Sequence, residues 1–92
     1  MIRSLHDKGT EALYEGRNVR RFQAFQKQAE QRMQILDSAT AIEDLMLLPS
    51  NRFEALSGDR KGQHSIRISQ QWRICCEWHE DGPHKVEIAD YH

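Results

Sequence analysis

Cysteine, proline and long apolar runs are all scarce in this sequence. The chain of 92 residues has two cysteines, and they are adjacent, Cys75 and Cys76. Neighbouring residues of a strand point to opposite faces, which argues against a disulfide between them, and the pair lacks the CxxC spacing of a zinc site. We therefore expect two reduced thiols, at least one of them buried, and neither a metal site nor a cofactor.

No apolar stretch approaches the roughly 20 residues that are needed to cross a membrane. The first residues, Met1 to Asp7, turn polar at once and lack the apolar core of a signal sequence. Hydrophobic residues make up 38% of the chain, which is enough to build a core and excludes a disordered protein. We expect one cytoplasmic domain over residues 1–92, with no membrane partner.

A strong net charge is also missing, because the formal net charge is −1. Basic residues are nevertheless concentrated in two segments. Five lie from Arg52 to Arg73 against two acidic residues, and five lie from Arg17 to Arg32 against Glu30. A nearly neutral total is therefore compatible with a basic surface for an anionic partner.

The first half of the sequence has the periodicity of helices. The segment from Asp7 to Tyr14 predicts a short helix, with Asp7 or Thr10 as its cap. Apolar residues then recur every three or four positions from Asn18 to Leu36, which predicts a longer amphipathic helix with Asn18 as its N-cap.

A third, short helix and then strands follow. Thr40 and Glu43 fit a capping box for a helix from Ala41 to Leu47. Ile2 to Leu5 is a candidate first strand, and later segments alternate as strands do: Asn51 to Leu56, Gln63 to Ile68, Trp72 to Trp78 and Val86 to Tyr91. We predict an α+β fold, with two N-terminal helices and the short third packed on one face of a mostly antiparallel sheet of about four strands.

Alternation along the strands divides their side chains into two sets. An apolar set is predicted to pack under the long helix: Ile66, Ile68, Trp72, Ile74, Cys76, Trp78, Val86 and Ile88. The other set carries the polar groups: Ser65, Arg67, Arg73, Cys75, Glu77, Glu87, Ala89 and Tyr91. A solvated sheet face is the ordinary explanation of such a polar set.

Two features of the polar set favour chemistry instead. Arg67 and Arg73 flank a short turn and lie close together if their strands pair, and guanidinium groups hold phosphate oxygens well. Tyr91 and His92 end the sequence beside the same face, where tyrosine can stack on a base and histidine can move protons. Together these groups suit metal-independent RNA cleavage, although a terminal histidine is more often an unstructured end.

The sequence resembles the HigB (plasmid-maintenance killer) branch of the RelE/ParE toxin superfamily. The resemblance covers nearly the whole chain and is carried by four segments: Asn51 to Gly62, Ser65 to Ile68, Gln71-Trp72-Arg73-Ile74, and Val86 to the Asp90-Tyr91-His92 end. It implies a small RelE-like domain and an endoribonuclease that cuts mRNA in the A site of the 70S ribosome. It also implies a HigA-like helix-turn-helix antitoxin, with operator DNA bound only through the toxin–antitoxin complex.

The resemblance also assigns residues. An active-site region is matched by Arg67, Arg73, Asp90, Tyr91 and His92, and a loop arginine by Arg60. Relatives often have histidine and lysine in this loop, where the present sequence has Glu54 and Ser57. A basic transition-state stabiliser is thus lost and a candidate general base, Glu54, is gained. Further contacts with RNA phosphates are expected from basic residues near the loop and the long helix: Lys61, Arg20 and Arg21.

Two other functions are compatible with the same fold. One is a ParE-like protein that inhibits DNA gyrase without being an enzyme, and it would not need His92 or paired arginines. The other is an inactive relative that only binds an antitoxin, for which Ser57 is the best support. We rank ribosome-dependent cleavage first.

Overall fold

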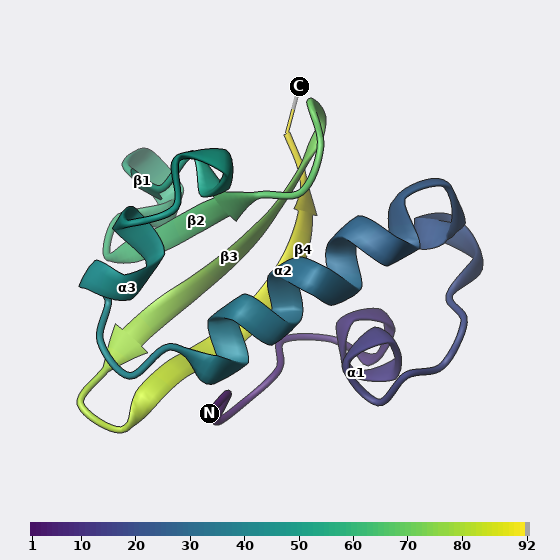
Figure 1. The fold of residues 1–92 in the computed structure, drawn as a ribbon, viewed down its shortest axis with the longest axis horizontal. Coiled ribbons are helices and arrows are strands. Elements are labelled where there is room, and N and C mark those ends of the chain that lie inside the picture. Colours follow the sequence, from purple (N-terminus) through teal and green to yellow (C-terminus); the bar gives the residue numbers. More distant parts are fainter. Residues whose placement is uncertain (92) are drawn as a thin grey trace.

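The structure is a computed structural model that describes residues 1–91. In that part of the chain the strands form one antiparallel sheet in the order β1-β2-β3-β4. Helix α2 crosses one face of this sheet, α1 lies next to α2 beside the β4 edge, and α3 lies beside β2 (Figure 1). The strands are β1 (Glu54–Ala55), β2 (Gln63–Arg67), β3 (Trp72–His79) and β4 (Gly82–Asp90). The predicted α+β arrangement is confirmed.

The helices are α1 (Lys8–Tyr14), α2 (Gln26–Ser38) and α3 (Glu43–Met46). Asp7 caps α1, because its Oδ1 accepts a hydrogen bond of 2.7 Å from the Thr10 backbone N–H. The Thr10 hydroxyl instead accepts a 3.1 Å bond from the Ile88 N–H, which ties α1 to β4. No helix of residues 1–91 is both long enough and apolar enough to span a membrane.

The long helix begins later than predicted, and Asn18 is not its cap. Residues Arg20–Phe25 form a 3-10 helix, and α-helical geometry starts at Gln26. The Gln26 amide donates to the Asn18 side chain at 3.1 Å and accepts from the Val19 N–H at 3.2 Å. The Asn18 oxygen is therefore engaged by a side chain and does not cap a backbone N–H.

The predicted capping box is also corrected. Asp44, rather than Glu43, accepts hydrogen bonds from the Thr40 N–H, the Thr40 hydroxyl and the Ala41 N–H at 2.9, 3.1 and 3.2 Å. These bonds hold residues 40 and 41 outside the helix, so α3 is shorter than the predicted Ala41 to Leu47.

The first strand is shorter than its alternation predicted. Pro49–Asn51 form a 3-10 turn, and Arg52 has a left-handed backbone with φ of 45°. Such a backbone cannot continue a strand ladder, so only Glu54–Ala55 pair with β2. The predicted strand from Asn51 to Leu56 is therefore correct only for Glu54–Ala55.

The last strand is longer than predicted, and the N-terminal segment runs beside it. β4 begins at Gly82, and its register with β3 shifts between Cys75 and Glu77. Residues 2 to 5 form no strand, yet Leu5 makes a parallel bridge with Val86. The backbone N–H of His6 also donates to the Val86 carbonyl at 2.8 Å. The segment therefore extends the sheet at the β4 edge.

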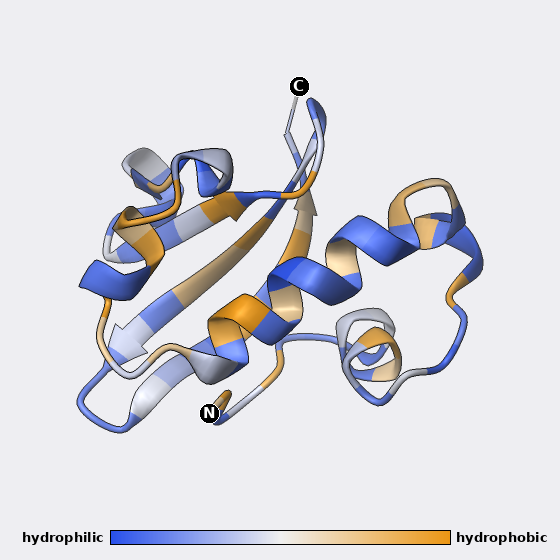
Figure 2. Ribbon diagram, viewed as in Figure 1, coloured by the Kyte–Doolittle hydropathy of each residue, from blue (hydrophilic) through white to orange (hydrophobic). Residues whose placement is uncertain are grey.

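The predicted apolar set belongs to the core or packs against it. In Figure 2, apolar segments are seen both on α2 and on the strands that it crosses. Trp72 packs on Phe25 with ring centroids 4.9 Å apart, so it is a core residue. The two thiols are free and buried, as expected.

The polar set is not a plain solvated face. Its small residues, Ser65, Cys75 and Ala89, are buried, at 2%, 0% and 6% exposure. Larger polar side chains from the same set and from the β1–β2 loop must therefore cover the middle of the sheet.

Candidate active site

A cleft of about 250 Å³ opens between the β1–β2 loop and the end of the last strand. It brings together three residues that the sequence analysis selected, Glu54, Arg60 and Tyr91, from separate parts of the chain. Ser57 lines it too, and the remaining lining residues are Ala55, Leu56 and Asp59.

Arg73 lies under this cleft and is mostly buried, with 11% of its side chain exposed. Its Nε donates to the Ser65 hydroxyl at 2.7 Å, and its guanidinium also donates to the Arg52 carbonyl. A terminal nitrogen lies 3.7 Å from Glu54, whose side chain is 59% exposed. Arg73 thus anchors the backbone just before β1 at Arg52. It also places a positive charge next to the accessible carboxylate of Glu54.

Arg67 is the direct cross-strand partner of Arg73, as the sequence predicted for paired strands. Its Nε donates to the Ser69 carbonyl at 3.1 Å, and its side chain is half-buried. The structure therefore places two guanidinium-bearing residues opposite each other on paired strands at the end of the β2–β3 hairpin. Two such groups suit a phosphodiester.

Arg60 bridges the loop and the last strand. One terminal nitrogen donates to Gln63 and to Glu87, each at 3.0 Å. The hydrogen bond to Glu87 is the main cause that raises the pKa of Arg60 above its usual value. This contact positions a permanent positive charge at the wall of the cleft.

Tyr91 is held from two sides. Its hydroxyl is hydrogen-bonded to the buried Cys75 thiol, and its backbone N–H donates to the Gln71 carbonyl. Burial, followed by the neighbouring Cys75, raises the pKa of Tyr91, so the phenol stays protonated near neutral pH. Burial likewise raises the pKa of the Cys75 thiol.

Asp90 lies in the opposite register from Tyr91, beside Trp72. The Gln71 amide nitrogen donates to its two carboxylate oxygens at 3.0 and 3.1 Å. The side chain anchors the end of β4 to the β2–β3 turn. His92, a predicted catalytic residue, lies outside the described residues.

The other predicted RNA-contacting residues lie outside the 250 Å³ cleft. Lys61 and Arg20 are exposed. Arg21 stacks over the Phe22 ring at 4.7 Å and lies 3.9 Å from Asp7. It lines a second cleft of about 490 Å³, together with Arg60 and Glu87. Arg60 thus stands between the two clefts.

Sequence reasoning missed several residues that build this site. It did not select Ser65, Cys75 or Glu87, which lie beneath the selected arginines and tyrosine. Strand register was the signal available, because all three alternate with the polar set and pair across β2, β3 and β4. It also did not select His6, Asp7 and Glu87 as candidate metal ligands, although their side chains lie together.

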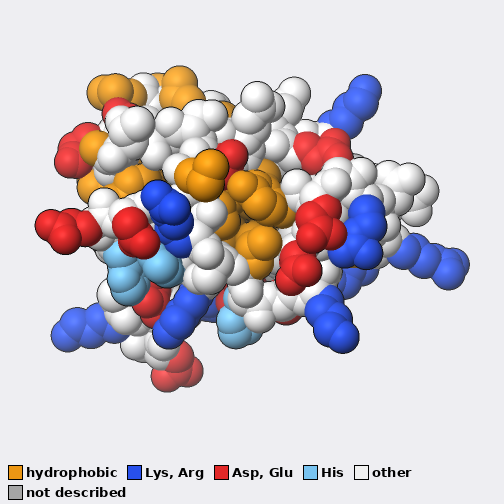
Figure 3. All heavy atoms as spheres, turned by 90° about the horizontal axis from the view of Figure 1, so that it is seen from below, with side chains coloured by type: hydrophobic (Ala, Val, Ile, Leu, Met, Phe, Trp, Pro, Cys, Tyr) orange, Lys and Arg blue, Asp and Glu red, His pale blue; other side chains and the backbone are white. Residues whose placement is uncertain are grey.

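Charge on the surface is mixed. On the side of the molecule seen in Figure 3, acidic and basic side chains alternate, with apolar side chains between them. On this side, positive charge is therefore interspersed with negative charge. Arg60 lines both clefts, and Arg21 lines the larger one, so each cleft has a local positive charge that could bind an anion.

Comparison with known proteins adds two findings. Residues 3–92 match the HigB-like toxin family, which is described as the RelE-like toxin of the type II toxin-antitoxin system HigB. The chain is also similar to Toxin HigB-1 of Vibrio cholerae serotype O1 (strain ATCC 39315 / El Tor Inaba N16961). The two are 36% identical over 80 residues, which is 85% of this chain and 84% of the relative.

Proposed function

The chain belongs to the HigB-like family of RelE-like toxins of type II toxin-antitoxin systems, and we propose that it is a ribosome-dependent endoribonuclease. The substrate would be mRNA in the ribosomal A site, in the cytoplasm, and the result would be inhibition of translation. Membership of a toxin-antitoxin family implies an antitoxin partner. We propose that this partner is HigA-like, with a helix-turn-helix, and binds operator DNA in complex with the toxin.

The observation that carries the proposal is the 250 Å³ cleft. An accessible carboxylate, a guanidinium and a protonated phenol meet there, with Arg73 directly below Glu54. Cleavage of RNA by its own 2′-OH requires a proton acceptor, positive charge near the phosphate and a proton donor. Glu54, the arginines and the Tyr91–His92 end offer these three functions.

The reaction can be written with these groups. Glu54 takes the proton of the 2′-OH as its oxygen attacks the adjacent phosphorus. Arg67 and Arg60 stabilise the pentavalent phosphate, and Arg73 holds the Glu54 carboxylate in place. The bond from phosphorus to the 5′-oxygen breaks, and His92 supplies a proton to that oxygen. A 2′,3′-cyclic phosphate and a 5′-hydroxyl end remain.

The other residues would hold the RNA and the active site. Tyr91 stacks on a base or donates a hydrogen bond, because its raised pKa keeps it protonated. Asp90 anchors the tail through Gln71. The exposed Lys61, Arg20 and Arg21 contact RNA phosphates of the mRNA or the ribosome.

Primer extension on a translated message after induction tests this function. The comparison includes the wild type, Arg73→Ala, Glu54→Gln and a chain that ends at Tyr91. Arg17→Ala serves as the matched control, because Arg17 is exposed and its side chain bonds, within residues 1–91, only to the neighbouring Glu15. We expect cuts in translated codons for the wild type and the control, and their loss in the other variants.

The same experiment separates the alternatives. Growth arrest with intact mRNA and gyrase-trapped, linear DNA would favour the ParE-like function. Absence of arrest together with tight binding to the antitoxin would favour the inactive relative.

A further inference from the structure

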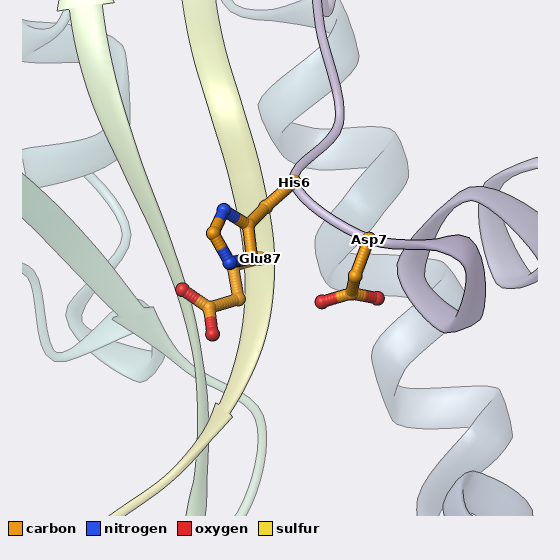
Figure 4. Close-up of side chains that lie close together, drawn as sticks. All are labelled: His6, Asp7 and Glu87. Atoms are coloured by element: carbon orange, nitrogen blue, oxygen red, sulfur yellow. The ribbon is translucent and has the colours of Figure 1, made fainter.

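Three side chains that take no direct part in the proposed cleavage lie together at the edge of β4 (Figure 4). They are His6 from the N-terminal segment, Asp7 from the start of α1, and Glu87 from β4. One ligand atom from each lies within 4.8 Å of the others. The three side chains border the open 490 Å³ cleft, so an ion can reach them.

Backbone contacts hold this group in place. The His6 N–H donates to the Val86 carbonyl at 2.8 Å, and the Val86 N–H donates to the Ser4 carbonyl at 3.1 Å. A further 2.8 Å bond joins the Lys85 N–H to the Ser4 hydroxyl. His6 therefore follows a parallel bridge and lies next to Glu87, as a cross-strand neighbour would.

The contacts already present use only one oxygen of each carboxylate. Oδ1 of Asp7 accepts from the Thr10 N–H at 2.7 Å and lies 3.9 Å from Arg21. Oε1 of Glu87 accepts from Arg60 at 3.0 Å. Within residues 1–91, the second oxygen of each carboxylate accepts no hydrogen bond, and the His6 ring has no hydrogen-bond partner. Each residue thus has an atom that is free to coordinate a metal ion: an imidazole nitrogen of His6 and one carboxylate oxygen each of Asp7 and Glu87.

We propose that His6, Asp7 and Glu87 bind a divalent transition-metal ion of the zinc type. One imidazole nitrogen and two carboxylate oxygens are ligands that zinc accepts, whereas magnesium and calcium favour oxygen alone. Three protein ligands leave a coordination position for water. Arg60 and Arg21 lie close by and oppose a second positive charge, so the affinity falls below that of a buried structural zinc site.

A bound ion would join the N-terminal segment, the start of α1 and β4. Because the three ligands meet only in the folded chain, the ion raises the midpoint of thermal unfolding. This inference does not depend on RNA cleavage, since both the ligands and the expected effect concern the folded protein alone.

A pair of histidines in another part of the fold provides the control. At the β3–β4 hairpin, His79 contacts Glu77 at 3.0 Å and His84 contacts Asp81 at 2.7 Å. The two rings are in contact, with centroids 4.3 Å apart and planes tilted by 36°. These imidazoles already have carboxylate partners, so His79→Gln removes an exposed histidine without touching the proposed site.

The test is calorimetric titration of the tag-free, full-length chain with Zn²⁺ alone, with thermal unfolding measured in parallel. We expect one saturable site in the wild type and in His79→Gln, and an affinity at least about tenfold weaker in His6→Gln and Glu87→Gln. Since Glu87→Gln also disturbs Arg60, His6→Gln is the decisive variant, and its unfolding midpoint without zinc should match the wild type. No saturable binding in the wild type, unchanged affinity in His6→Gln, or loss of binding in His79→Gln would overturn the proposal.

Discussion

The Tyr91 hydroxyl is hydrogen-bonded to the thiol of Cys75, which is 0% exposed at the centre of the sheet. A neutral hydrogen bond of this kind contributes about 1 kcal/mol. We predict that Cys75→Ala slows RNA cleavage several-fold, because the phenol loses its anchor, while Cys75→Ser retains the wild-type rate.

A double-mutant cycle checks this pair. Tyr91→Phe removes the same bond from the other side, so Cys75→Ala should have no further effect on positioning when it is added to Tyr91→Phe. Cys76→Ala is the matched control, because Cys76 faces the helices and not Tyr91. Additive losses in the cycle would show that Cys75 and Tyr91 act separately.

Arg73 is predicted to matter for stability as well as for activity. Its side chain satisfies the Arg52 carbonyl and the Ser65 hydroxyl from a mostly buried position. Arg73→Ala removes both bonds and leaves the buried Ser65 hydroxyl without this donor, which costs about 1–3 kcal/mol. Chemical denaturation should show a lower midpoint for this variant. Arg67→Ala should lose less, because within residues 1–91 the Arg67 side chain donates one hydrogen bond, to the Ser69 carbonyl. Equal losses in both variants would contradict the anchoring role.

The cap of α3 gives a pH-dependent prediction. Hydrogen bonds from Thr40 and Ala41 lower the pKa of Asp44 below its usual value of 3.8. A carboxylate whose folded pKa is depressed stabilises the fold above its unfolded pKa, and this stabilisation is lost as the pH falls through the folded value. The difference in unfolding midpoint between the wild type and Asp44→Asn should therefore be present at neutral pH and shrink below pH 3.8.

Glu43→Gln is the control for this measurement, because Glu43 is the residue that the sequence pattern assigned to the cap. It should have little effect on the midpoint at any pH. A larger fall of the unfolding midpoint in Glu43→Gln than in Asp44→Asn would show that Glu43 is the capping residue, as the sequence pattern predicted.

The thiols provide a test of the fold itself. Burial raises the pKa of Cys76 to about 12, and Cys75 and Cys76 are 0% and 2% exposed. A thiol reagent should therefore react slowly with the native protein near neutral pH and stoichiometrically after denaturation. Rapid labelling of two thiols in the native state would show that the sheet centre is open.

Sequence periodicity predicted the elements whose own side chains determine them. The apolar set from Ile66 to Ile88 forms the sheet side of the core, and Asp7 caps α1 as its position suggested. The predicted ends of helices and strands were wrong where contacts beyond the local pattern determine them. Gln26 engages Asn18, and the left-handed backbone at Arg52 ends a strand that alternation alone would continue.

The candidate site was predictable in part for the same reason. Pairing of Arg67 with Arg73 follows from the short turn between their strands. The approach of Glu54 and Arg60 to Tyr91 depends on how the β1–β2 loop folds over the sheet, which no local pattern encodes. Glu87 was missed because its importance comes from its contact with Arg60, 27 residues away.

The proposed activity is cleavage of mRNA on the ribosome at the cleft that Glu54, Arg60 and Tyr91 line. The most direct measurement maps the ends produced when the purified chain is added to one defined mRNA, with and without programmed ribosomes. We expect new 2′,3′-cyclic phosphate ends within codons only when ribosomes are present, and their loss in Glu54→Gln. Intact mRNA on programmed ribosomes with the wild-type chain would contradict it.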